Sequence, residues 1–424
     1  SADPVGTWLT RRLGQDKADT PDKLWRKILL FPPDLKEVKP EELPETAIFE
    51  GWGWVSMRSG WDADAVFAHF SSGMKGQGEP AHLDNNQFVI YHKGLLAVDG
   101  VKPVASEKFP DTYERMTLAH NTITVYDPEE KIWGRSMYVY TQVHNNPFPV
   151  NDGGQTFRKD CYLDNLYNVR GPSKMVKQGD IVAYETSALY DYTCGDATKS
   201  YAAHKMKHFT RQFVFLKPDL FVVFDRVVST KKEYRKRWHL QFFAEPVVEG
   251  TLTRVDYDGG RLWCETLLPE KATVRKVQGS QVEQADGTYV LPEIWRERDS
   301  DSWRIDVGPG EARTDDVFLH VLQATDAGKP RTFTAETFRK GGSVGVRVKR
   351  GSRTFEVLFA TAGAPGGHLT IVEDGKPLTD KDLATQVVDS YAQWKDDPRF
   401  RMWMTDKRFR YTIPEADRER FAVK

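Results

Sequence analysis

The chain has 424 residues, and its 60 Lys and Arg nearly balance its 61 Asp and Glu, so the formal net charge is −1 at pH 7. A dedicated nucleic-acid-binding protein usually carries a clear basic excess. The balance therefore argues against nucleic acid as the partner, while a local basic groove for an acidic polymer stays compatible with it. No apolar run approaches the ~20 residues of a membrane-spanning helix, so no membrane span is expected.

Aromatic residues make up 12% of the chain and include 12 Trp. This content suits a β-sandwich core, and it also suits a surface whose flat rings cover the apolar faces of sugars. The cysteines are Cys161, Cys194 and Cys264, an odd, low count that predicts neither a disulfide framework nor a thiolate metal cluster. One bridge between Cys161 and Cys194 is open to the chain, but unbridged core cysteines are favoured. No signal peptide is seen at Ser1.

The first segment, residues 1–32, is predicted to be helical. Thr20 is typical of an N-cap and Pro21 of a first helical position. The apolar residues that follow repeat at helical spacing up to Pro32. Residues 34–47 are charged and contain Pro, as is typical of a linker.

From Ala47 onward the chain is rich in predicted strands. These are residues 49–58, 65–70, 88–91, 95–98, 121–125, 213–216, 220–228, 238–243, 261–266, 317–323, 344–348, 355–360 and 369–372. Short strands separated by Gly, Pro and Asp indicate a β-sandwich. No alternation of strands with helices is visible. The predicted fold class is mainly β, a large antiparallel β-sandwich with a short N-terminal helical segment.

Two other segments are less regular. Residues 145–200 are polar and rich in Tyr, which fits either a binding loop or extra edge structure of the sandwich. The tail from Thr379 is predicted to be partly helical, because Leu383, Val387, Val388 and Tyr391 have helical spacing. Its end, 399–424, is rich in basic and aromatic residues, as in a solvated charged face.

Three potential metal ligands stand at the edges of predicted strands. His82 precedes the strand at 88–91, Asp99 closes the one at 95–98, and His120 opens the one at 121–125. Adjacent strands lie roughly 5 Å apart, so such ligands can converge on one ion. Two imidazoles and a carboxylate are a common zinc set. The spacing alone equally fits buried histidines and an Asp at a turn, because no short HxxxH or CxxC pattern is present.

Six ordered blocks resemble the C-terminal β-domain of heparinase II/III-like polysaccharide lyases. They are residues 81–91, 94–100, 119–125, 195–198, 211–227 and 237–241, within a resemblance that covers roughly residues 45–330. The resemblance implies a structural zinc held by His82, Asp99 and His120. It also implies an acidic polysaccharide as partner and a periplasmic or secreted location. The corresponding division is 1–46 as the end of an α-helical toroid with a linker, 47–330 as the main β-sandwich, and 331–424 as further strands and a partly helical tail.

This chain departs from the family pattern in two ways. Many members carry a second His two residues before the zinc His, where this chain has Pro80. The catalytic Tyr of the family and its His or Asn partner usually lie in the toroid. Only about the first 45 residues of this chain could belong to that domain, so an upstream toroid or a second chain is expected as partner.

A lyase has to remove the C5 proton of a uronic acid, neutralise its carboxylate and protonate the leaving oxygen. Tyr113 and Arg115 lie on the predicted loop before His120, and in similar lyases this loop faces the cleft. They are therefore the predicted catalytic pair, with an ordinary loop Tyr and a surface Arg as the alternative. Asn85 and Asn86 are predicted to bind the substrate carboxylate, with turn capping as the alternative.

Three functional hypotheses follow. The first is a portion of a polysaccharide lyase that acts by β-elimination on a uronic-acid polymer and contains a structural zinc. The second is a non-catalytic carbohydrate-binding or assembly module of the same fold. The third is a hydrolytic metal centre with an activated water, for which Glu79 and Glu114 are candidate bases by proximity alone.

Overall fold

The computed structural model describes residues 41, 43–50, 52–76, 82–100, 113–130, 150–156, 162–168, 171–293 and 301–388. Thr46–Val388 forms one compact unit, and Ser1–Glu45 with Asp389–Lys424 forms a second. The predicted helix at 1–32 and the charged end at 399–424 lie outside the described residues. In the part of the chain that is described, no helix has the length and apolar character needed to cross a membrane.

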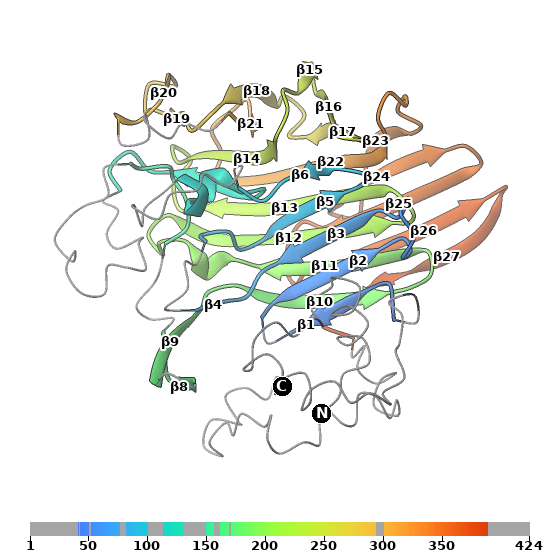
Figure 1. Cartoon of the computed structure of the whole chain (residues 1–424), viewed down its shortest axis with the longest axis horizontal. Helices are drawn as coiled ribbons and strands as arrows, with labels where there is room; N and C mark the ends of the chain where they lie inside the picture. Colours follow the sequence, from blue (N-terminus) through green and yellow to red (C-terminus); the bar gives the residue numbers. More distant parts are fainter. Residues whose placement is uncertain are drawn as a thin grey trace, which may run out of the picture. The chain divides into compact units, whose positions relative to one another are not determined.

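Three large sheets account for most of the compact unit (Figure 1). The first sheet has the order β1-β2-β3-β5-β6, with β1 Ala47–Phe49, β2 Trp54–Arg58, β3 Phe67–Ser71, β5 Gln87–Tyr91 and β6 Leu95–Ala97. The central sheet runs β10 Asp180–Thr186, β11 Tyr190–Asp196, β12 Met206–Leu216, β13 Leu220–Ser229, β22 Asp315–Asp326, β17 Gly260–Leu268, β16 Leu252–Tyr257 and β15 Val247–Glu249. The third consists of β23 Thr334–Lys340, β24 Ser343–Arg350, β25 Arg353–Ala360, β26 Gly367–Glu373 and β27 Lys376–Leu383.

Smaller sheets and short 3-10 helices complete the described elements. One sheet has the order β18 Thr273–Gln278, β21 Trp303–Gly308, β14 Arg235–Phe242 and β7 Ile123–Tyr126. Another has the order β4 Met74–Gly76, β9 Gly171–Lys177 and β8 Tyr162–Asn168, and a hairpin joins β19 Val282–Glu283 to β20 Tyr289–Val290. The 3-10 helices are η2 Tyr113–Arg115, η3 Thr117–Ala119 and η6 Thr198–Ser200.

The central sheet is covered on both faces. On one face, Phe224 stacks on Phe359 of the third sheet, with ring centroids 4.6 Å apart. On the opposite face, Phe213 contacts Phe70 and Phe88 of the first sheet, at 5.9 and 5.2 Å between centroids. This explains the almost unbroken apolar runs in β12 and β13, because a strand that is buried on both sides needs apolar residues at every position. The result is a three-layered β-sandwich, which confirms the predicted fold class.

A buried arginine of the central sheet reaches across to the first sheet. Arg211 of β12 donates to both carboxylate oxygens of Asp225 on β13, at 2.6 and 2.9 Å, and both side chains are fully buried. The same guanidinium donates to the backbone carbonyls of Asn86, at 2.7 Å, and Asn121. Since these carbonyls lie just before β5 and β7, Arg211 holds in register the two segments that also carry His82 and His120.

The predicted strands are confirmed, but the predicted helix in the tail is wrong where the structure describes it. Lys376–Leu383 is strand β27, which pairs antiparallel with β26. Leu383 is buried in the core that the central and third sheets share. Sheet pairing and this burial override the helical spacing of a few apolar residues, because propensity is weaker than tertiary context. Tyr391 lies outside the described residues.

The Tyr-rich segment forms sheet structure over much of its described length. Tyr184 lies in β10, and Tyr190 and Tyr192 lie in β11, and all three are buried. Both strands belong to the central sheet, so this part of 145–200 extends the sandwich.

The predicted boundary at residue 330 falls within the compact unit Thr46–Val388.

The two described cysteines should be chemically inert in the native protein. Cys194 and Cys264 are unbridged and buried, so the Cys161–Cys194 bridge is not formed. Burial raises the pKa of both thiols well above the ordinary value, which suppresses the reactive thiolate. We expect neither to react with iodoacetamide until the protein is unfolded in guanidinium, as followed by peptide mass spectrometry. Alkylation of either thiol at the rate of an exposed cysteine would contradict this burial.

Candidate metal centre

Four side chains that could hold a metal ion converge beside the first sheet: His82, Asp84, Asp99 and His120. One ligand atom from each lies within 4.8 Å of all the others. Asp84 precedes β5 and Asp99 follows β6, and these two strands are antiparallel neighbours. His120 directly follows η3, and its ring centroid is 5.1 Å from that of His82. The structure thus brings together the three ligands expected from the sequence.

The donor set fits zinc. Zinc takes imidazole nitrogens and carboxylate oxygens at about 2.0–2.2 Å, which places tetrahedral ligands roughly 3.5 Å apart. The separations are within 4.8 Å, so at most a small inward movement of side chains would meet that requirement. Two nitrogen and two oxygen donors are available for it.

The surroundings of Asp99 favour its ionised form. Its side chain is 42% exposed, and its Oδ1 lies 2.7 Å from Nδ1 of the fully buried His120. Partial burial raises the pKa of Asp99, but His120, His82 and a hydrogen bond from Gln87 lower it more, so the net pKa is well below the ordinary value. The carboxylate is therefore charged at neutral pH.

Asp84 is the member of the group that the sequence analysis missed. It is 6% exposed, and its Oδ2 accepts a hydrogen bond from Nε2 of Gln87 at 2.9 Å. The signal was present in the His82-Leu83-Asp84 spacing, since alternate residues of an extended chain point to the same side. With Asp84 the group has four protein donors, which is the number typical of a structural zinc site.

Asn85 and Asn86 form the turn that leads into β5. Asn85 is 2% exposed, accepts from the Gly73 amide at 2.9 Å and donates to Ser200 Oγ at 2.9 Å. Asn86 is 0% exposed, has φ of +62°, and donates to the Gly195 carbonyl at 3.1 Å. These contacts fix the loop that carries His82 and Asp84. The predicted contact of these amides with a substrate carboxylate stays a prediction.

Tyr113 and Arg115 lie in η2, which is fastened to the metal loop. The Leu83 amide donates to the Arg115 carbonyl at 2.9 Å. Tyr113 is 4% exposed, and its hydroxyl accepts from Nη1 of the buried Arg304 at 3.2 Å. Burial raises the pKa of Tyr113, and the opposing effect of Arg304 does not cancel it. The hydroxyl is therefore protonated at neutral pH and faces the interior, while Arg115 is half-buried.

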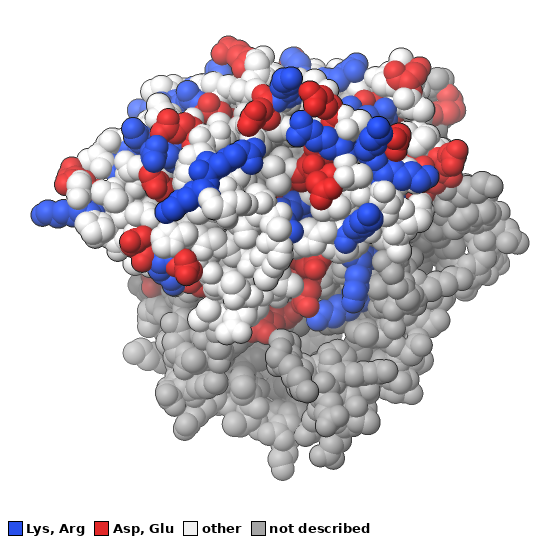
Figure 2. Space-filling view, turned by 180° about the vertical axis from the view of Figure 1, so that it is seen from behind, with Lys and Arg blue, Asp and Glu red and all other residues white. Residues whose placement is uncertain are grey.

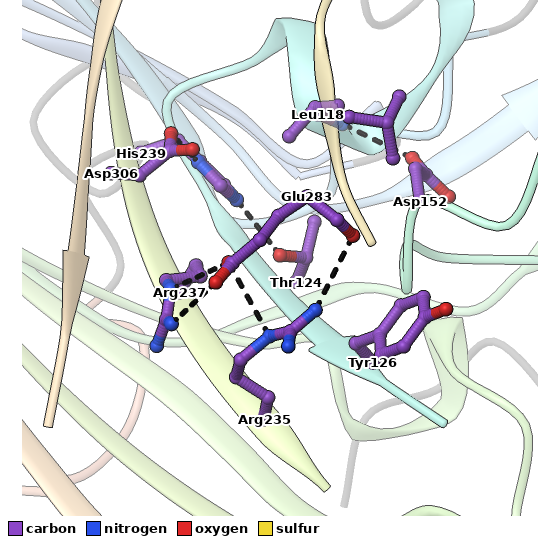
Figure 3. Close-up of a pocket in the computed structure, with 10 residues that line it drawn as sticks. Leu118, Thr124, Tyr126, Asp152, Arg235, Arg237, His239, Glu283 and Asp306 are labelled. Atoms are coloured by element: carbon purple, nitrogen blue, oxygen red, sulfur yellow. Dashed lines mark hydrogen bonds and ion pairs between the residues drawn. The ribbon is translucent and has the colours of Figure 1, made fainter. Parts of the chain in front are cut away.

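A polar pocket lies beside η3, between β7, β14, β21 and the β19–β20 hairpin (Figure 3). His239 stands between two partners, with Nδ1 2.7 Å from Asp306 and Nε2 2.8 Å from Thr124. Arg237 makes two hydrogen bonds, of 2.9 and 2.8 Å, to Glu283. Thr124, His239 and Asp306 are each at most 3% exposed, so these three side chains stabilise the floor of the pocket and offer little surface to a substrate.

Comparison with known proteins agrees with this architecture. The family model described as heparinase II/III-like, C-terminal, matches residues 42–344. No curated protein sequence is significantly similar to the chain.

Several solved structures are similar to the chain. Heparan sulfate lyase HepC from Pedobacter heparinus has a TM-score of 0.51 and 15% identity, over 89% of this chain and 48% of its own. A mutant of the same lyase has a TM-score of 0.49 and 14% identity, over 83% of this chain and 44% of its own. Heparinase III has a TM-score of 0.48 and 12% identity, over 82% of this chain and 44% of its own. The chain thus spans less than half the length of these structures. Since the family model covers most of its residues, the chain belongs to the heparinase II/III-like family and contains its C-terminal domain.

Proposed function

We propose that the chain is a portion of a polysaccharide lyase that cleaves a uronic-acid-containing polysaccharide by β-elimination. The observation that carries the proposal is the convergence of His82, Asp84, Asp99 and His120 within a domain of this family. The solved structures of the same fold are named as heparan sulfate lyase and heparinase, which supports an acidic polysaccharide as the substrate class. The same likeness supports a periplasmic or secreted location.

The metal in this proposal is a structural zinc. Its ligands are the two imidazoles and two carboxylates of the group, and with four protein donors no coordination position is left for an activated water. This disfavours the hydrolytic alternative. Side chains from the loop before β5, the end of β6 and the end of η3 would hold the ion. The same loop is hydrogen-bonded to η2, which carries Tyr113 and Arg115, through Leu83.

The elimination requires three functions: neutralising the carboxylate, protonating the leaving oxygen and removing the C5 proton. Residues of this chain perform the first two. Arg115 is assigned to the substrate carboxylate, because a guanidinium can pair with it through two hydrogen bonds. Tyr113 is assigned to protonation of the leaving oxygen, because its raised pKa keeps the hydroxyl protonated. For this the hydroxyl has to turn out of its contact with Arg304. The base that removes the C5 proton comes from an upstream helical domain.

The proposal is tested by absorbance near 232 nm, where unsaturated uronates absorb, on a panel of acidic polysaccharides. We expect product when an upstream helical fragment is added, and a loss of about a hundredfold or more in the Tyr113→Phe variant, in line with loss of an acid–base group. The matched control is Tyr234→Phe, since Tyr234 is also buried, at 6% exposed, and lies outside the site. Equal rates in the two variants would exclude Tyr113 from the chemistry.

The second candidate function is a non-catalytic carbohydrate-binding or assembly module. It is favoured by the interior positions of Tyr113, Asn85 and Asn86 and by Pro80 in the place of the usual second His. Absence of product both with and without the upstream fragment, together with retained binding of the polysaccharide, would select this function over the lyase.

A further inference from the structure

The outer face of the first sheet exposes large aromatic side chains at one end. Phe49 is 47%, Trp52 52% and Trp54 43% exposed. Phe49 and Trp54 are paired across β1 and β2, so the three rings form one surface, which we call the aromatic platform. Burying such apolar surface would stabilise the protein or its complex by about 25 cal/mol per Å². Contiguous exposed apolar area of this kind marks a binding surface.

The rings of the platform are held in a defined arrangement. Trp52 and Trp54 stack with centroids 5.6 Å apart and planes inclined by 25°. Trp54 also meets the ring of His69 edge-on, at 5.8 Å and 70°. His69 in turn lies 3.3 Å from Ser56 Oγ through its Nδ1. Because the rings support one another, little side-chain entropy is lost when a ligand stacks on them.

The backbone beneath the platform is equally constrained. Gly53 has φ of +68°, and a Cβ at this position would lie 2.0 Å from the Ser72 carbonyl oxygen. A Cβ on Gly73 would lie 2.1 Å from the Trp52 carbonyl oxygen. The Trp52 amide donates to the Phe49 carbonyl at 3.0 Å, and the Ser72 amide to the Gly53 carbonyl at 2.8 Å. Two glycines in close contact therefore fix the turn that presents Trp52.

A cation lies further along the same face. Arg58 follows Trp54 by four residues on β2, and the burial pattern of the strand places both side chains outward. Their Cα atoms are therefore about 13 Å apart, at about 3.3 Å per residue. The Arg58 guanidinium is 4.5 Å from the ring centroids of both Trp61 and Phe67, which fixes its position. Exposed aromatic rings with a guanidinium at this distance match a ligand that has both apolar ring faces and anionic groups.

The register of the sheet leads from the platform towards the metal group. Trp54 pairs with Ser71, and Ser71 pairs with Gln87. Gln87 donates to Asp84 at 2.9 Å. Trp54 is thus two strand spacings, about 10 Å, from Gln87, which orients the candidate metal ligand Asp84. A polymer on the platform would lie within a few sugar units of the loop that carries His82.

We propose that the aromatic platform and Arg58 bind an acidic polysaccharide. One sugar ring packs against the exposed part of the Trp52–Trp54 stack, and a carboxylate or sulfate of a nearby unit pairs with Arg58. The ligand class rests on the proposed function, but the surface is a binding site separate from the metal group and from η2. It would hold the polymer beside the domain in either of the two proposed functions.

The test is affinity electrophoresis and tryptophan fluorescence titration with heparan sulfate, alginate and polygalacturonate, and with a neutral cellulose derivative. We expect the Trp52→Ala/Trp54→Ala variant to raise Kd for an acidic polymer about tenfold or more. Arg58→Gln should weaken binding of acidic polymers but not of the neutral one. Its effect should be smaller at high salt, since salt screens the ion pair. The control is Leu378→Ala, because Leu378 is similarly exposed, at 43%, and lies on β27 of the third sheet.

Unchanged affinity in the double Trp variant, or an equal loss in Leu378→Ala, would overturn the proposal. A double variant that binds polymer normally but no longer associates with an upstream helical fragment would also overturn it and make the platform a domain interface. Lyase activity is measured separately, as absorbance near 232 nm. The substrates for this assay are oligosaccharides too short to reach from the aromatic platform to the metal group and η2. Binding that depends on the platform without any product would contradict the lyase function alone, and product without such binding would contradict the platform alone.

Discussion

The Arg211→Met variant should lose about 3–5 kcal/mol of unfolding free energy, the cost of removing one partner of a buried ion pair. Asp225 would be left with a carboxylate that is 0% exposed, and the carbonyls of Asn86 and Asn121 would lose the guanidinium that donates to them. Burial already raises the pKa of Asp225 against the opposing effect of Arg211. Without Arg211 that carboxyl should become protonated in the folded state.

The measurement is urea unfolding followed by tryptophan fluorescence, with Arg347→Met as the matched control. Arg347 is 37% exposed and pairs with Glu336 and Glu356 on the third sheet. Exposed pairs of this kind contribute about 0–1 kcal/mol. A second variant, Arg211→Met/Asp225→Leu, should recover part of the loss, because apolar replacement of both partners is often tolerated. A loss of unfolding free energy for Arg211→Met no larger than that of the control would refute the bridging role of Arg211.

Charges of both signs are mixed on the described surface. In the view of Figure 2, Lys and Arg side chains are interspersed with Asp and Glu over the described surface. The near-zero net charge of the whole chain agrees with this mixture of signs.

The His120→Ala variant should lose its bound metal and, with it, a large part of the stability of the domain. A ligand present at 100 times its Kd stabilises the folded state by about 2.7 kcal/mol, and the energy of binding at a structural site is coupled to folding. We expect close to one zinc per chain in the unchanged protein, by elemental analysis after dialysis. The variant should have well under a tenth of that amount and a lower Tm that EDTA no longer shifts.

The control for this variant is His204→Ala, because the His204 side chain is 55% exposed and lies beside Asp127, away from the metal group. Asp84→Asn tests the fourth ligand separately and should weaken zinc binding without abolishing it. A His120→Ala protein that kept both its metal content and its Tm would show that the four side chains do not form the proposed zinc site.

The sequence by itself determined the fold class and most of the strands. Apolar runs such as Leu220 to Phe224 persist over both faces of a strand only when each face is buried, and alternation with turn residues marks the remaining strands. The ordered blocks also indicated His82, Asp99 and His120. Their spacing alone could not, because the ligands are separated by long stretches of sequence.

Only the tertiary structure decided the features that depend on non-local pairing. β27 is a strand because β26 supplies its hydrogen bonds and the shared core buries Leu383. Asp84 joins the metal group because the turn at Asn85 and Asn86 directs the loop towards β6. Tyr113 is interior because Arg304, far away in sequence, lies against its hydroxyl. Local patterns report the preference of each segment, whereas these outcomes depend on which distant segment packs against it.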